Sequence, residues 1–179
     1  MPTFISLLRG INVGGHRKIR MADLKQIYEG LGYSDIRTYL QSGNVIFNSN
    51  RAEVDHSGAI HAAIAERFGF DIPVLVMSDG SFTRLVDSNP LFERPEIDVS
   101  YLHVMFLYAT PSVTGIPDED LPRSQGEEAA FSSGHVILYC PNGYGRTKLT
   151  NEYFERVLDV PATTRNWKTV LALRDMVST

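Results

Sequence analysis

The amino-acid sequence predicts an α+β fold, with a ferredoxin-like βαββαβ half over residues 1–90 and a degenerate second α+β half over 91–179, intertwined in one compact unit. Three observations support this prediction. Strand-type and helix-type hydrophobic patterns alternate over residues 3–77 in the order of a split βαβ plan. A length of 179 residues suits one domain or two small halves. The segment 42–47, SGNVIF, is echoed at 133–138 by SGHVIL.

The first half contains four strand patterns and two helix patterns. The strands are predicted over residues 3–8, 36–41, 44–49 and 71–77. Ser42-Gly43 joins the middle two as a tight hairpin. One helix is predicted over 21–32; the other is capped by Asn50, with Glu53 completing a capping box, and is ended by Gly69. We therefore expect an antiparallel sheet of order 4-1-3-2 with both helices on one face, in which strands 3–8 and 35–41 are parallel and separated by 43–48.

The second half is less regular. A short helix is predicted over 80–87, a strand over 101–108, and a loop with at most one helical turn over 109–126. A hairpin and two closing helices follow, over residues 128–132, 135–140, 149–158 and 164–177. Thr164 is the expected N-cap of the last helix, and Trp167 is expected in the core. The second half is either a degenerate repeat of the first or an independent hairpin with the same turn chemistry.

Composition narrows the functional classes. Hydrophobic content of 43% and charged content of 21% are ordinary for a soluble globular protein. The start lacks a basic leader and a cleavage site, and no apolar stretch approaches the ~20 residues that span a membrane. Cys140 is the only cysteine, which excludes an intrachain disulfide and fits a reducing cytoplasm. A net charge of −4 argues against an unspecific nucleic-acid binder. These features predict a cytoplasmic protein without membrane association.

Basic residues cluster in three segments that contain no Asp or Glu, namely 9–20, 146–148 and 165–168. They hold 8 of the 17 Lys and Arg residues, and chance is the alternative explanation. The first segment is a long glycine-rich connection, which the predicted topology places beside the 41–44 hairpin. Arg165 and Lys168 are expected in the first turn of the last helix, where the helix dipole disfavours cations and a bound anion would relieve the cost.

These observations lead to a hypothesis of one anion site. Its predicted ligand-binding residues are Arg9, Asn12, Gly14, Gly15, Lys18, Gln41, Asn44, Arg146, Lys148, Arg165, Asn166 and Lys168. The alternatives are a plain turn with a solvated basic rim, and cations that reach carboxylates elsewhere in the fold.

Motifs for named chemistries are absent. A phosphate-binding Walker loop would need Lys and Ser or Thr at positions 16 and 17, where the chain has His16 and Arg17. The histidines lack zinc-type spacing, no serine lies in a nucleophile-elbow pattern, and the aromatic ribonucleoprotein signature is missing. Catalytic residues and cofactors therefore stay unknown, and no metal site is predicted.

Four motifs are similar to those of one family. LLRGINVGG with Lys18 and Met21, then TYLQSGNVIF, GRTKLT and PATTRNW, resemble the domain of unknown function 1697 (DUF1697) family of uncharacterised bacterial proteins. The resemblance implies an α+β fold with ferredoxin-like halves, and it implies no established activity, cofactor or catalytic residue. The family often has a small polar residue where this chain has His16 or Lys168, so those charges are particular to this protein.

The leading functional hypothesis is a cytoplasmic protein that binds a small anionic, phosphate-bearing ligand. An enzyme acting on such a ligand is one alternative, and a concave pocket with strongly shifted pKa values would favour it. A protein-interaction module is another, favoured by a flat apolar patch. Nucleic acid is an open but less favoured partner, and the oligomeric state is open.

Overall fold

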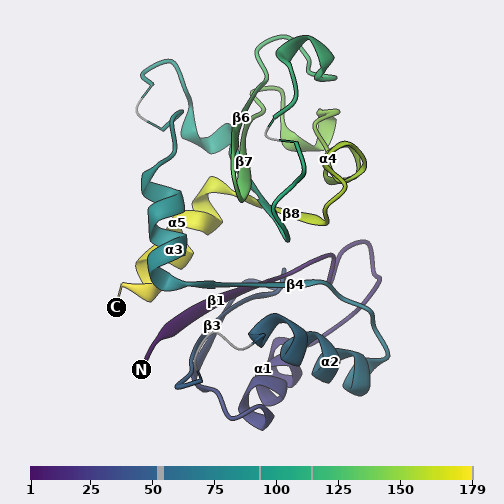
Figure 1. The fold of residues 1–179 in the computed structure, drawn as a ribbon, viewed down its shortest axis with the longest axis vertical. Coiled ribbons are helices and arrows are strands. Elements are labelled where there is room, and N and C mark those ends of the chain that lie inside the picture. Colours follow the sequence, from purple (N-terminus) through teal and green to yellow (C-terminus); the bar gives the residue numbers. More distant parts are fainter. Residues whose placement is uncertain (52–54, 93, 114, 179) are drawn as a thin grey trace. The chain divides into compact units, whose positions relative to one another are not determined.

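The structure, a computed structural model, describes residues 1–51, 55–92, 94–113 and 115–178 (Figure 1). The chain divides into two compact units. The first comprises Met1–Leu85 with Leu173–Thr179, and the second comprises Val86–Ala172. The halves predicted at 1–90 and 91–179 stay a prediction.

The first unit contains one four-stranded antiparallel sheet. Its elements are β1 (Thr3–Leu8), α1 (Met21–Gly30), β2 (Ser34–Tyr39), β3 (Asn44–Asn48), α2 (His56–Phe68) and β4 (Val74–Ser78), followed by α3 (Asp79–Asp87). The strand order is β2-β3-β1-β4. Since β1 and β2 both pair antiparallel with β3, they are parallel to each other and separated by it. The predicted order and strand directions are confirmed.

Helices α1 and α2 cover one face of this sheet (Figure 1). Each helix buries the apolar stripe that its sequence predicts, including Leu24 and Tyr28 on α1 and Ile60 and Ile64 on α2. Tyr28 is fully buried, and its hydroxyl lies 2.5 Å from the Ser6 hydroxyl, so the one polar atom of this ring has a partner. This packing holds the first turn of α1 at a fixed place beside the sheet.

Helix α2 starts later than predicted. Asp55 is its N-cap, and its carboxylate accepts a hydrogen bond of 2.8 Å from the Gly58 amide. The prediction of Asn50 as the cap is therefore wrong, because an Asp five residues further on satisfies the free amide. The Glu53 part of the predicted capping box lies outside the described residues. Gly69 ends the helix with φ +69, as predicted.

The second unit also contains a four-stranded antiparallel sheet. Its strands and helices are β5 (Leu102–Leu107), β6 (Glu128–Ser132), β7 (His135–Tyr139), α4 (Asn151–Leu158), β8 (Ala162–Asn166) and the start of α5 (Trp167–Val177), whose residues from Leu173 belong to the first unit. The strand order is β6-β7-β5-β8, which matches the first unit strand for strand. Between β5 and β6 the described chain has one short 3-10 turn, η2 (Asp118–Asp120), as predicted. The α+β class is confirmed, whereas the ferredoxin-like classification stays a prediction.

Strand β8 corrects the sequence analysis. The last helix was expected to begin after Thr164, but Thr164 and Arg165 lie in β8, where they pair with Met105 and Val104 of β5. β-Branched threonines favour an extended strand, and Asn166 caps α5 by accepting 2.8 Å from the Thr169 amide. The second unit therefore has a fourth strand, β8, that the sequence pattern did not predict.

Each unit also has two backbone hydrogen bonds outside its sheet ladder, at corresponding positions. At the end of the first strand, the Leu8 amide donates to the Gly43 carbonyl at 2.8 Å, and the Leu107 amide donates to the Gly134 carbonyl at 3.0 Å. The next residue repeats the pattern. Arg9 donates to the Pro73 carbonyl at 3.1 Å, as Tyr108 does to the Pro161 carbonyl at 2.9 Å. These matched bonds favour a structural repeat over two independent hairpins.

Two further buried side chains are Trp167 and Cys140. Trp167 is buried, with 2% of its surface exposed, as predicted. Cys140 is fully buried, and burial raises the pKa of its thiol to about 11, so it lacks the thiolate character of a nucleophile. No helix in the described part of the chain is long and apolar enough to cross a membrane.

Candidate functional site

The connection between β1 and α1 has an unusual backbone. Five of its residues have left-handed φ values: Gly10 at 65°, Asn12 at 56°, Gly14 at 57°, Gly15 at 79° and Arg17 at 47°. Glycine adopts this conformation without steric cost, and Asn tolerates it better than most residues do. The glycines therefore allow a compact, repeatedly reversed path, which includes a tight turn closed by the His16 amide on the Val13 carbonyl at 3.1 Å.

Asn12 holds this loop together and fastens it to the hairpin. Its side-chain amide donates to the Ile19 carbonyl at 2.9 Å and to the Gln41 carbonyl at 2.7 Å. Its side-chain oxygen accepts from the Ile19 amide at 2.9 Å. The loop and the β2–β3 hairpin therefore lie side by side, as the topology predicts. The Asn12 amide makes these bonds within the protein, so it acts as a clip.

The hairpin itself is closely packed. A Cβ at Gly43 would lie 2.7 Å from the Leu8 Cβ and 2.9 Å from the Ile11 Cδ1, so only glycine fits there. Asn44, the next residue, is fully buried. Its amide donates to the Tyr39 carbonyl at 2.9 Å and to the Ser42 hydroxyl at 3.0 Å. These bonds give Asn44 a structural role at the turn.

A cavity of ≈ 550 Å³ opens where the loop meets the start of α1. Its lining residues are Asn12, Gly15, Lys18, Ile19, Arg20, Asp23 and Gln41. Lys18 is exposed, and it forms no ion pair with any of the described residues. The wall is more apolar than polar, because Ile19 and the aliphatic parts of the long side chains contribute to it.

Asp23 lies in the first turn of α1, where its carboxylate would by itself repel an anion. The structure pairs it with Arg20, whose Nε and Nη2 atoms donate to the two carboxylate oxygens at 2.7 and 2.9 Å. The hydrogen bond from Arg20 lowers the pKa of Asp23 below its ordinary value. The carboxylate is thus charged but paired, and Lys18 leaves the cavity with an excess of positive charge.

The structure brings together four of the twelve predicted residues in this cavity: Asn12, Gly15, Lys18 and Gln41. Gly14 precedes Gly15 in the loop, while Arg9 is half-buried and its backbone amide binds Pro73. Sequence reasoning missed Ile19, Arg20 and Asp23 as parts of the wall. The available signal for Ile19 was a large apolar residue between the two cations Lys18 and Arg20.

The other predicted residues belong to the second unit. Arg146 and Lys148 are exposed in and after η3 (Tyr144–Arg146), and Lys168 is exposed in the first turn of α5. Asn166 caps α5. Arg165 is buried, with 8% exposed, and its guanidinium donates to the Thr163 hydroxyl at 2.8 Å. The expectation of two cations in the first helical turn is wrong, because Arg165 lies in β8.

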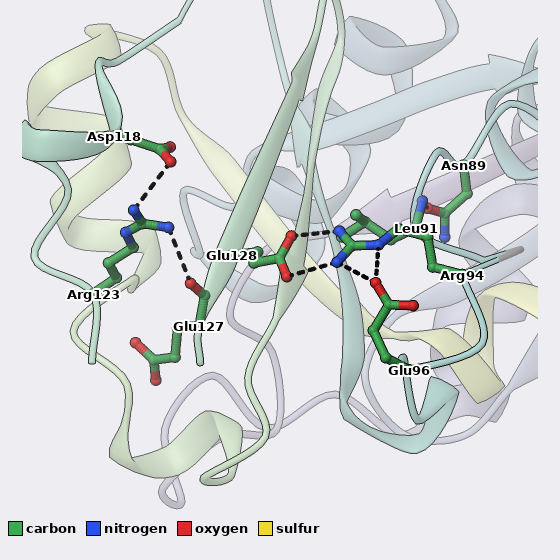
Figure 2. A network of polar contacts seen from close by, with 8 residues as sticks. All are labelled: Asn89, Leu91, Arg94, Glu96, Asp118, Arg123, Glu127 and Glu128. Carbon is green, nitrogen blue, oxygen red and sulfur yellow. Dashed lines mark hydrogen bonds and ion pairs between the residues drawn. The ribbon is translucent and has the colours of Figure 1, made fainter. Parts of the chain in front are cut away.

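The second unit has its own polar network (Figure 2). Arg94 makes a two-pronged ion pair with Glu128 of β6 at 2.7 and 3.2 Å, and a further bond of 2.7 Å to Glu96. The hydrogen bonds that Arg94 donates to these carboxylates raise its pKa above the ordinary value. The Arg94 guanidinium lies between the two carboxylates, and its ion pair with Glu128 connects Arg94 to the sheet.

A second part of the network involves Arg123 (Figure 2). Its guanidinium pairs with Asp118 of η2 at 3.0 Å and donates to the Glu127 carbonyl at 3.4 Å. The Glu127 side chain is buried and accepts 2.8 Å from the Ser124 amide. A polar cavity of ≈ 510 Å³ lies here, but its cation is already paired. Among the described residues, no group of three His, Cys, Asp or Glu side chains could hold a metal ion.

Comparisons with known proteins agree with the fold. The model of the family of proteins of unknown function DUF1697 matches residues 1–137. The chain belongs to this family. The GRTKLT and PATTRNW motifs lie beyond the matched residues. No curated protein matches the chain.

A solved structure is similar over almost the whole length. The conserved bacterial protein SP0830 from Streptococcus pneumoniae shares 24% sequence identity with a TM-score of 0.70, and the match covers 98% of each chain. At this identity the likeness concerns the fold alone. The DUF1697 family assignment therefore adds no activity to what the cavity suggests.

Proposed function

We propose that this DUF1697 protein binds a small phosphate-bearing ligand in the cavity between the β1–α1 loop and the β2–β3 hairpin. The observation that carries the proposal is the position of Lys18, an exposed ammonium without an ion-pair partner in the described chain, on the wall of a ≈ 550 Å³ cavity. Phosphate oxygens accept charge-assisted hydrogen bonds from such a group. The loop from residue 9 to 20 contains no acid that could compete.

The backbone of the loop supports the same conclusion. Glycine-rich turns expose amide N–H groups to an anion, and Gly15 has no heavy atom within 4 Å of the place its Cβ would occupy. The Asn12 clip holds the loop beside Gln41 at 2.7 Å, so the wall is organised before a ligand arrives. Preorganisation of this kind reduces the ordering cost of binding.

The proposal concerns the first unit only. The predicted ligand contacts of Arg146, Lys148, Arg165, Asn166 and Lys168 stay a separate prediction, and the proposal does not depend on them. Arg20 is a second cation on the cavity wall, and its pairing with Asp23 holds it in place.

Thermal melting at low salt tests the proposal with inorganic phosphate, sugar phosphates, nucleotides and short oligonucleotides. A phosphate-bearing ligand at ~100 times its dissociation constant should stabilise the fold by about 2.7 kcal/mol, which is a shift of about 5–10 °C for a chain of this size. Lys18→Gln should weaken binding about tenfold or more, since it removes a charge-assisted hydrogen bond.

Lys25→Gln is the matched control, because Lys25 is exposed on α1 and does not line the cavity. It should leave the melting shift unchanged. The proposal fails if nothing in the panel shifts the melting temperature. A shift that survives Lys18→Gln would place the site elsewhere.

A further inference from the structure

Leu40, at the tip of the β2–β3 hairpin, breaks two rules of local structure at once. Its φ is +57°, in the left-handed region that glycine and asparagine occupy far more readily than leucine. Leu40 is also 56% exposed. Burial of the leucine side chain therefore offsets only a small part of the conformational free energy that its left-handed backbone costs. A residue that breaks a local rule without a structural gain points to a functional role.

The position of Leu40 relates it to the cavity. It directly precedes Gln41, which lines the cavity and accepts the hydrogen bond from the Asn12 amide. On the other side of that bond, Asn12 is followed by Val13, which is 64% exposed. Two exposed apolar residues, Leu40 and Val13, are thus the sequence neighbours of the two residues that this hydrogen bond joins. Ile19 and the aliphatic stems add apolar surface within the cavity.

We infer that the ligand of this cavity is a phosphate ester carrying an apolar group, and that Leu40 contacts that group. The inference rests on the proposed phosphate site and adds the second half of the ligand. Lys18 binds the anionic head, while the apolar part of the ligand covers Leu40 and the carbon-rich wall. A nucleobase and a hydrocarbon chain are two sources of such a group, and both present apolar surface next to a phosphate.

Three monophosphates with the same head group separate these cases by titration calorimetry. Ribose 5-phosphate has no apolar group, AMP carries a nucleobase, and geranyl monophosphate carries a hydrocarbon chain. Burial of about 60 Å² of apolar ligand surface corresponds to about tenfold in affinity. AMP, geranyl monophosphate or both should therefore bind about tenfold more tightly than ribose 5-phosphate.

Two variants of Leu40 complete the test. Leu40→Asn removes the apolar side chain and suits the left-handed backbone, so it should raise the melting temperature by about 2–4 °C and abolish the advantage of the tighter ligand. Leu40→Met keeps an apolar side chain on a backbone that is equally unfavourable for it. It should therefore keep the tighter binding of AMP or geranyl monophosphate relative to ribose 5-phosphate. Ribose 5-phosphate should bind both variants and the original protein within about twofold, because its contacts are those of the head group.

The outcomes distinguish this inference from the proposed function. Preference for AMP alone would identify a nucleobase, preference for geranyl monophosphate alone would identify a hydrocarbon chain, and either supports the inference if Leu40→Asn removes it. Equal binding of all three ligands, unchanged in Leu40→Asn, would overturn the inference and leave the phosphate site standing. Absence of binding by all three would overturn both.

Discussion

The two units have the same sheet and different edges. Each has four antiparallel strands in matching order, and each carries the same two backbone bonds at the end of its first strand. After that strand the first unit has a glycine-rich basic loop and α1, whereas the described residues between β5 and β6 of the second unit include one 3-10 turn, η2. The cavities at these matched edges differ accordingly.

In the first unit the edge cavity includes Lys18, Arg20 and Gln41. In the second unit a cavity of ≈ 300 Å³ lies at the matching place, between the chain after β5 and the β6–β7 hairpin, and its wall is mostly apolar. Its lining residues are Leu107, Thr110, Pro111, Val113, Phe131, Ser132, Ser133 and Leu158. The shared sheet places a cavity at each edge, and the loop sequence decides its chemistry. Function in this fold therefore has to be inferred from the loops.

The matched hairpin glycines, Gly43 and Gly134, should differ widely in how much stability the same substitution costs. Gly43→Ala would place a Cβ 2.7 Å from the Leu8 Cβ at a φ of +77°. Overpacking and the left-handed backbone together should destabilise the protein by about 3 kcal/mol. At Gly134 a Cβ meets no heavy atom within 4 Å, so Gly134→Ala should change stability by less than about 0.5 kcal/mol. Urea unfolding of both variants measures the difference, and equal losses would refute the contrast.

The element order of the first unit was predictable because three of its four strands, β1, β3 and β4, have a clear hydrophobic run, and the pairing follows from a short list of topologies. β8 was missed because Ala162–Asn166, ATTRN, has a single apolar side chain and gains its strand conformation from pairing with β5. That pairing is non-local, so no sequence window contains it. The burial of Arg165 was missed for the same reason, since the register of β8 decides which side chains turn inward.

The site was predictable to a similar extent. Topology alone placed the β1–α1 loop beside the hairpin, and the structure confirms that placement through Asn12 and Gln41. The pattern marked Asn12 and Asn44 as polar residues at the edge, but their amides bind backbone carbonyls of the protein. An amide that binds a ligand and an amide that closes a loop have the same sequence signal, so only the coordinates separate them.

The corresponding strands β3 and β7 begin with different residues, Asn44 in the first unit and His135 in the second. Both are buried, and burial lowers the pKa of His135 to about 4. In the unfolded chain a histidine pKa is ~6.5, so the unfolded state binds more protons between the two values. The contribution of His135 to the unfolding free energy is therefore fully present above pH 6.5. It is lost as the pH falls from there toward 4. Between pH 7 and 5 the loss should be about 2 kcal/mol.

His135→Asn, which introduces the residue of the matched position, should remove this part of the pH dependence. The comparison uses the slope of the unfolding free energy between pH 7 and 5, so a uniform loss of stability in the variant does not affect it. His16→Asn is the control, because His16 is exposed in the β1–α1 loop. An unchanged slope in His135→Asn would mean that His135 stays neutral or charged equally in both states.

The connection after the first strand is held by neutral hydrogen bonds of Asn12 in the first unit and by the ion pair of Arg123 with Asp118 in the second. The Asn12 bonds should contribute more to stability. Asn12→Gly keeps a residue that suits φ +56° and removes three hydrogen bonds of 2.7–2.9 Å. We expect a loss of about 1.5 kcal/mol that is insensitive to salt, because a neutral amide makes these bonds. Thermal unfolding at low and high salt measures both quantities. A loss that disappears in salt would contradict the neutral clip.

The smallest effect is expected at the corresponding connection of the second unit, where Arg123 pairs with Asp118 at 3.0 Å. Both side chains are more than a third accessible, at 35% for Arg123 and 66% for Asp118. Water therefore screens the pair, and its net contribution to stability is small. Arg123→Gln should cost about 0.5 kcal/mol at low salt and less at 1 M salt, where charges are screened within about 3 Å. Hydrogen exchange of the Ser124 and Glu127 amides would report the same change locally. If Arg123→Gln destabilised the protein as much as Asn12→Gly, with no dependence on salt, the two connections would be held by equivalent bonds and the contrast between the units would be confined to their cavities.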